Sequence, residues 1–178
     1  MADAKISALP AATTPLAGTE LVPIVQSGTT KKVAASSLAS GPAFRAYSNN
    51  SQSIPSGATT KIQFNVEDFD TNNNYDNATN YRFTPTVAGY YQINMAVGFA
   101  AMGVGEIILQ INKSGSVYQF GSDVVGTTTY ISSMSTLVYL NGSTDYVEGF
   151  VQQASGVARN LAASSSQCSF SGALVRGA

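Results

Sequence analysis

Four carboxylates and three asparagines crowd one short stretch of this chain, and together they have the oxygen chemistry of a cation site. They are Glu67, Asp68, Asp70 and Asp76, with Asn72, Asn73 and Asn74 among them. Carboxylate and amide oxygens are the ligands that Ca²⁺ prefers, so one interpretation is a calcium site formed by Asp68, Asp70 and Asp76. The stretch lacks the twelve-residue loop with a central Gly and a closing Glu, however, and Asn and Asp are also turn formers. The sequence therefore favours solvated acids in a turn, without a metal or any other cofactor.

Residue types that are absent or rare in this sequence exclude most kinds of enzyme active site. The 178 residues include no histidine, which excludes imidazole-based catalysis and removes the commonest zinc ligand. The single cysteine, Cys168, has no partner for an intrachain disulfide, and its neighbours offer no base or cation that would lower its pKa. No pair of carboxylates has a spacing that predicts a sugar-cleaving cleft. We therefore expect a protein that is not an enzyme, with Cys168 as a small buried strand residue.

Charge and hydropathy exclude two further classes of partner. Only 11% of the residues are charged and the net charge is -1, whereas nucleic-acid binding needs clustered Lys and Arg. Lys31 and Lys32 form the one basic pair. No apolar run reaches 18 residues and no secretory signal follows Met1, so we expect no nucleic-acid partner, no membrane insertion and synthesis in a cytoplasm.

From residue 43 onward, short segments of alternating polarity predict an all-β, antiparallel sandwich. The clearest alternation runs from Tyr91 to Phe99, where apolar side chains alternate with small or polar ones. Lys113, Ser114 and Gly115 supply a hairpin turn. Further strands are expected at 44–47, 61–66, 106–112, 117–120, 127–140, 146–152 and 169–175, and no helix of three turns is expected.

The first 42 residues read as a separate segment that ends at a Ser40-Gly41-Pro42 hinge. Their prolines leave room only for short extended pieces at 20–26 and 31–34, which cannot bury a core. They are nevertheless too apolar for a free linker. We interpret residues 1–42 as an extended N-terminal docking segment, with Leu9, Leu21, Ile24 and Val25 as docking residues, and residues 43–178 as the folded domain. The alternative is a tail packed on its own domain.

Two surface features suggest partners. Small or apolar residues occupy positions where a monomer would meet water, which favours oligomerisation; they include Ala96, Gly98, Ala100, Ala101, Met102, Gly103 and Val104. Two predicted loops, at 118–130 and 149–166, are rich in residues that bind sugars and proteins, with Tyr118 and Tyr130 as contact candidates for a host surface glycan or protein. Ordinary sandwich loops are the alternative interpretation.

The residues between 72 and 93 carry a resemblance to the C1q/tumour-necrosis-factor-like jelly roll. Its recurring pattern is matched by Tyr75, Asp76, Thr79, Phe83, Gly89 and Tyr91, and further matches are Leu140, Asp145, Tyr146, Val147 and the segment 170–174. One extra residue separates Thr79 from Phe83, and the loop 141–145 lacks the usual Gly-Asp pair. The resemblance covers 43–175 and implies a homotrimer. Tyr90, Tyr91, Phe99 and Met102 become candidates for the trimer interface or the core.

The N-terminal residues 5–33 resemble the attachment segment of tailed-bacteriophage fibre and spike proteins. This resemblance implies a structural virion protein that docks on tail, neck or capsid proteins and projects its jelly roll for adhesion to the host. A head fibre or capsid-decorating protein is the first alternative. A secreted carbohydrate-binding lectin is the second, and it would require a signal peptide.

Overall fold

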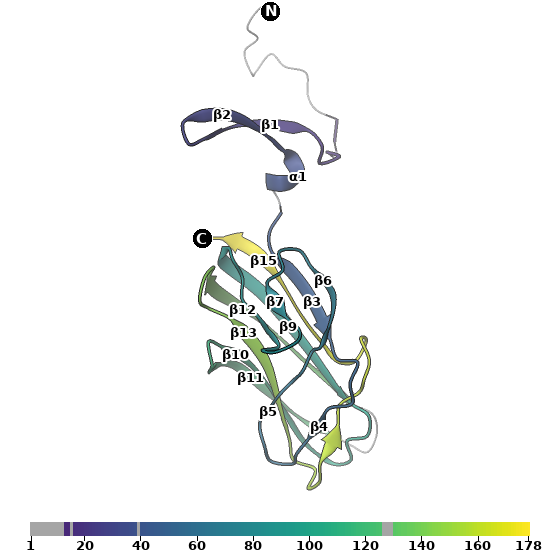
Figure 1. Cartoon of the computed structure of the whole chain (residues 1–178). Helices are drawn as coiled ribbons and strands as arrows, with labels where there is room; N and C mark the ends of the chain where they lie inside the picture. Colours follow the sequence, from purple (N-terminus) through teal and green to yellow (C-terminus); the bar gives the residue numbers. More distant parts are fainter. Residues whose placement is uncertain (1–12, 15, 39, 126–129) are drawn as a thin grey trace, which may run out of the picture. The chain divides into compact units, whose positions relative to one another are not determined.

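The computed structural model describes residues 13–14, 16–38, 40–125 and 130–178. The chain divides into two compact units, Met1–Ser40 and Gly41–Ala178, which are coloured along the sequence in Figure 1. Each unit is described by itself. No helix in the described part of the chain is long and apolar enough to span a membrane.

The N-terminal unit is a β-hairpin followed by one helical turn. Strand β1 (Leu21–Gln26) pairs antiparallel with β2 (Thr29–Ala34), and α1 (Ala35–Leu38) follows. Ser27 and Gly28 between the strands both have positive φ, 53° and 72°, which is the type I′ geometry that suits the twist of a two-residue hairpin. The two extended pieces expected from the sequence thus form a single hairpin.

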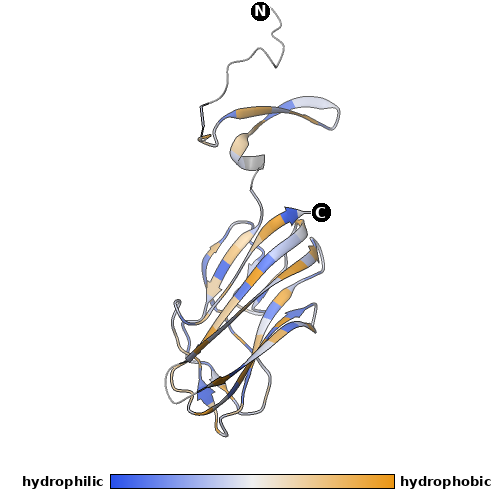
Figure 2. Cartoon of the chain, turned by 180° about the vertical axis from the view of Figure 1, so that it is seen from behind, coloured by the Kyte–Doolittle hydropathy of each residue, from blue (hydrophilic) through white to orange (hydrophobic). Residues whose placement is uncertain are grey.

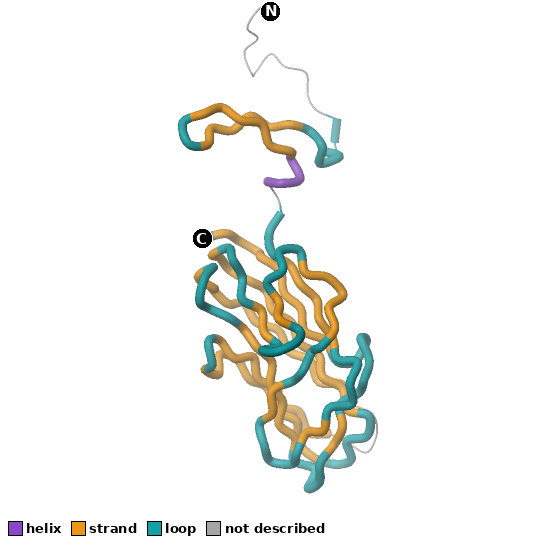
Figure 3. Tube along the Cα trace, viewed as in Figure 1, coloured by secondary structure: helices purple, strands orange, loops and turns teal. Residues whose placement is uncertain are grey.

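The second unit is a sandwich of two antiparallel sheets, and Figure 3 separates its strands from its loops. Sheet I has the order β12-β9-β15-β3-β6, and sheet II the order β11-β10-β13-β8-β7 with β5 beside β13. The strands of sheet I are β3 (Ala43–Tyr47), β6 (Val66–Asp70), β9 (Ala88–Phe99), β12 (Tyr130–Asn141) and β15 (Ser169–Gly177). Those of sheet II are β5 (Thr60–Lys61), β7 (Tyr75–Asp76), β8 (Arg82–Phe83), β10 (Gly105–Lys113), β11 (Ser116–Val125) and β13 (Val147–Gln153). A small pair, β4 (Ser53–Ile54) and β14 (Arg159–Asn160), forms a separate two-stranded sheet.

The first and last strands of this unit are neighbours. Ala43 of β3 is paired with Ala173 of β15, and the Leu174 N–H donates to the Pro42 carbonyl at 2.9 Å. Because the strands are antiparallel, the start of β3 lies beside the end of β15, as Figure 1 shows.

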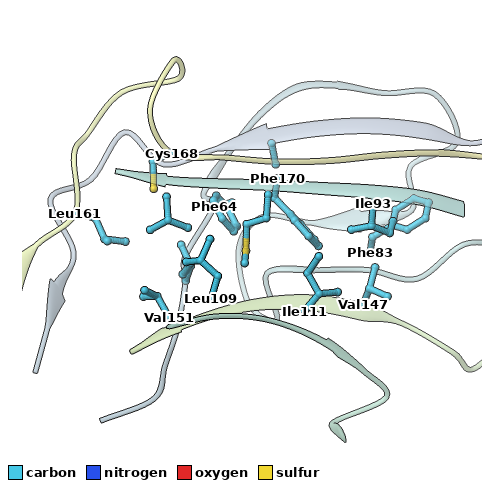
Figure 4. Close-up of a cluster of buried hydrophobic side chains, with 14 of the residues drawn as sticks. Phe64, Phe83, Ile93, Leu109, Ile111, Val147, Val151, Leu161, Cys168 and Phe170 are labelled. Carbon is cyan, nitrogen blue, oxygen red and sulfur yellow. The ribbon is translucent and has the colours of Figure 1, made fainter. Parts of the chain in front are cut away.

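The core fills the space between the sheets because alternate side chains of each strand point into it. The alternation appears as successive hydrophobic and hydrophilic bands along the strands in Figure 2. The Phe44 ring from sheet I stacks on Phe83 and Tyr75 of sheet II, with centroid distances of 4.3 and 5.1 Å. Phe170 packs edge-on against Phe44 at 5.4 Å. In Figure 4, Phe64, Ile93, Leu109, Ile111, Val151, Cys168 and Phe170 lie between the two layers.

Four sequence predictions about elements need correction. The strand expected at 61–66 is divided, because residues 62–65 cross between the sheets; Ile62 and Phe64 are buried there. The acids at 67–70 lie in strand β6 instead of a turn. Cys168 is buried as expected, but it precedes β15. Residues 118–125, expected to begin a loop, belong to strand β11.

Candidate functional site

The side of sheet I that faces away from sheet II carries few charged side chains, and we call it the outward face of sheet I. Alternation with the buried side chains and the strand register place these residues on it: Ala43, Arg45, Phe69, Tyr90, Gln92, Asn94, Ala96, Ile131, Ser133, Ser135, Leu137, Tyr139, Ser169, Ser171, Ala173 and Arg176. Of the two arginines in this set, Arg45 is neutralised in an ion pair with Asp68, and Arg176 is paired with Tyr90 near the end of β15. A face of this composition carries no strong electrostatic barrier to a second copy of itself.

One end of this face is apolar. Tyr90 and Tyr139 are cross-strand partners, and their rings meet edge-to-face with centroids 5.5 Å apart. With the exposed Leu137 and Val175 they line a shallow concavity of about 560 Å³, which Arg176, Gly177 and Ala178 complete. Exposed apolar side chains gathered in this way are the usual mark of a protein interface.

The other half of the face is built from small and polar side chains. Asn94 and Ala96 of β9 lie beside Ser135 and Ser133 of β12, and with Ser169 of β15 they line a second concavity of about 370 Å³. Small side chains let another backbone approach closely, and the amide and hydroxyl groups retain hydrogen-bonding capacity. The face therefore combines an apolar anchor region with a close-approach region.

The free edge of sheet I is partly blocked. Strand β12 is the last strand of this sheet, so its outer carbonyls are open to a further strand. The Tyr118 hydroxyl donates to the Leu137 carbonyl at 3.1 Å, and the Lys113 ammonium donates to the Tyr139 carbonyl at 2.8 Å. Because side chains already occupy these acceptors, association through the outward face is favoured over addition of a strand to this edge.

The structure separates the interface candidates that the sequence had grouped. Tyr90 lies exposed on the outward face of sheet I, whereas Tyr91, Phe99 and Met102 are fully buried in the core. Met102 had been expected on a water-facing surface, and that expectation is wrong; Gly98 is likewise buried. Ala96 lies on the outward face and Val104 is exposed.

Two residues of the face, Leu137 and Tyr139, were missed by the sequence reasoning. The expected core phase of this strand ran through Met134, Val138 and Leu140. Leu137 and Tyr139 lie at the alternate positions of the same strand, which point to its other side. Apolar residues at both sets of positions are the signal that could have identified them.

The proposed calcium ligands are each engaged elsewhere. Asp68 pairs with Arg45, and Asp70 accepts the Tyr75 N–H at 2.6 Å. Asp76 accepts the N–H groups of Thr79, Ala78 and Asn80 at 2.9, 3.0 and 3.1 Å. Within the described ranges, no three His, Cys, Asp or Glu side chains gather in a way that could hold a metal ion.

Asp76 instead organises its own turn, which gives a testable pH dependence. The N–H bonds, that of Thr79 first, lower the pKa of this carboxyl from about 3.8 to about 2. The pKa of Asp76 is lower in the folded protein than in the unfolded chain. The ionised carboxylate therefore stabilises the folded state above about pH 4, and this stabilisation is lost as pH falls toward 2. We expect Asp76→Ala to lower the free energy of unfolding by about 1 to 2 kcal/mol at pH 7, in urea titrations.

The difference in the free energy of unfolding between Asp76→Ala and the wild type should become smaller as the pH falls from 4 to 2. Asp76→Asn is the matched control, because its amide oxygen still accepts a hydrogen bond but does not titrate in this range. A difference that stays constant from pH 7 to pH 2 would contradict the assigned role.

The remaining candidates are divided between the two units. Tyr118 lies in β11 and Tyr130 begins β12, so both are strand residues; residues 126–129 lie outside the described part of the chain. In the N-terminal unit, Leu21 and Val25 are exposed and Ile24 is partly buried. Leu9 lies outside the described residues.

Comparison with known proteins identifies the fold. No protein-family model matches the sequence, and no curated protein gives a significant match. Among solved structures, murine APRIL at pH 5.0 superposes with a TM-score of 0.58 at 9% identity, over 76% of this chain and 100% of APRIL. The Eiger TNF of S. frugiperda superposes with a TM-score of 0.55 at 8% identity, over 78% of this chain and 94% of Eiger. The expected C1q/TNF-like jelly-roll sandwich is thereby confirmed.

Proposed function

We propose that this protein is a non-enzymatic structural component that forms a homotrimer through the outward face of sheet I. The observation that carries the proposal is the group of exposed apolar side chains Tyr90, Leu137, Tyr139 and Val175 on one face of the sheet. Closed cyclic symmetry covers identical patches on every copy, and the resemblance to C1q-like jelly rolls favours threefold symmetry.

The trimer serves, in this proposal, as a fibre or spike of a tailed-bacteriophage virion. Support comes from the resemblance of residues 5–33 to phage attachment segments. The exposed Leu21 and Val25 add to it, because a lone two-stranded hairpin is only marginally stable without a partner surface. The hairpin unit docks on tail, neck or capsid proteins, and the jelly roll projects to adhere to a glycan or protein of the host surface. The protein is made in the host cytoplasm and resides in the virion.

One experiment with two readouts tests this proposal. The full chain and a fragment of residues 41–178 are compared by light scattering and by incorporation into phage particles. Both should have the mass of a trimer at micromolar concentration, because the interface lies in the jelly roll, whereas only the full chain should enter particles.

A stable monomer of the fragment would contradict the trimer. Normal occupancy of particles by the fragment would contradict the docking role of the N-terminal unit. Particles that bind hosts normally but lose physical stability without the protein would favour capsid decoration over adhesion.

A further inference from the structure

A row of side chains crosses the outer side of sheet II, opposite the outward face of sheet I. Phe120 of β11 is paired with Gln110 of β10, and Gln110 is paired with Phe150 of β13. Paired residues on neighbouring strands point to the same side of a sheet. Leu109 and Ile111, on either side of Gln110, are buried toward sheet I, so the Phe–Gln–Phe row points away from the core.

The row places two aromatic rings on a rigid support with an amide between them. The rings originate two strands apart, at a separation of about 10 Å. Phe120 is 65% exposed, while Gln110 and Phe150 are half-buried. Within the described ranges, no hydrogen-bond partner occupies the Gln110 amide. The row thus offers apolar ring faces and a free donor and acceptor along one line.

The charges near the row are compensated. The Lys61 ammonium lies 5.9 Å from the centroid of the Phe150 ring and forms an ion pair with the largely buried Glu148. In the neighbouring row, the Gln152 side chain accepts a hydrogen bond from Thr59 at 3.0 Å. The Arg82 guanidinium, on β8 beside Glu148, lies 4.2 Å from the centroid of the Tyr146 ring. The two cations near the row thus already have partners, so the charge balance suits a neutral ligand.

We propose that the Phe–Gln–Phe row binds a neutral glycan chain. The C–H faces of two alternate pyranose units pack on Phe120 and Phe150, and Gln110 exchanges hydrogen bonds with hydroxyl groups of the unit between them. The separation of the two rings, which originate two strands apart, matches the distance between alternate sugar units of an extended glycan chain. The inference deepens the adhesive role proposed above, on which it rests, and it assigns that role to the opposite side of the sandwich from the trimer interface.

The test uses the full-length protein with defined probes. Cellohexaose, maltohexaose and chitohexaose represent neutral chains, and polygalacturonate represents an acidic one, with binding followed by isothermal titration calorimetry and affinity electrophoresis. At least one neutral hexasaccharide should bind. Phe120→Ala, Phe150→Ala and Gln110→Ala should each weaken that binding about tenfold or more.

Val124→Ala is the matched control, because Val124 is 86% exposed on the same strand but outside the row. It should leave binding unchanged. Absence of binding to every neutral probe, preference for polygalacturonate, or binding that survives both Phe substitutions would each overturn the proposal.

Light scattering of the same variants separates this proposal from the trimer. If Phe120→Ala reduces the oligomer mass, the row is an interface between copies and the glycan proposal is overturned. If the wild type is monomeric yet binds a hexasaccharide with the expected variant pattern, the glycan site stands and the trimer is wrong.

Discussion

Phe44→Ala should lower the free energy of unfolding of the jelly-roll unit by about 4 kcal/mol. Phe44 is 1% exposed, and its ring bridges the two sheets by stacking on Phe83 and Tyr75, while Phe170 of its own sheet packs against it edge-on. Removing the ring opens a cavity where the sheets meet, and rings held by both sheets cannot collapse into it easily. Urea unfolding of residues 41–178 followed by tyrosine fluorescence measures the loss.

Phe120→Ala is the control for this substitution. Phe120 lies on β11 of sheet II, away from the core and from the proposed trimer interface, and is 65% exposed. The same change of side chain should therefore cost less than about 1 kcal/mol. Equal losses at the two positions would show that Phe44 is not the bridge between the sheets.

Leu137→Glu should convert the proposed trimer into a folded monomer. Leu137 is 50% exposed in the free unit, at the centre of the apolar part of the outward face of sheet I. In a trimer each copy would bury a carboxylate against apolar side chains, which is unfavourable even with Arg176 in the same concavity, so the dissociation constant should rise by a factor on the order of 100 or more. Sedimentation velocity across a concentration series measures this shift, and an unchanged urea midpoint of the monomer shows that the fold persists.

Val157→Glu is the matched control, because Val157 is 54% exposed but lies in the connection after β13, away from the proposed interface. Its variant should remain trimeric. A Leu137→Glu protein that still sediments as a trimer would place the interface on another surface.

Local sequence signals were sufficient for the central strands and one turn. The alternation from Tyr91 to Phe99 predicts β9, because a half-buried strand has a period of two. Ser114 and Gly115 have φ values of 48° and 83°, the positive pair that the predicted hairpin turn requires. In these segments the decisive interactions are local, so the sequence alone carries them.

The errors arise where a distant segment decides the structure. Strand β6 carries acids that suggest a turn, but it pairs with β3, and Arg45 on that strand neutralises Asp68. Tyr90 and Tyr91 are adjacent and chemically equal, and only the register of β9 between β12 and β15 decides which of them faces out. A shift of one residue would exchange them, so the interface candidates could not be separated from the sequence.

The pairing of β3 with β15 also bears on how this unit could be used as a building block. Since Ala43 lies opposite Ala173, the polypeptide enters and leaves the sandwich at neighbouring points. A domain with such closely spaced ends can be spliced into a surface loop of another protein as a cassette, without stretching its host. The same proximity allows the two ends of the unit to be joined by a short linker and new ends to be opened at a distant turn, such as the one around Gly156.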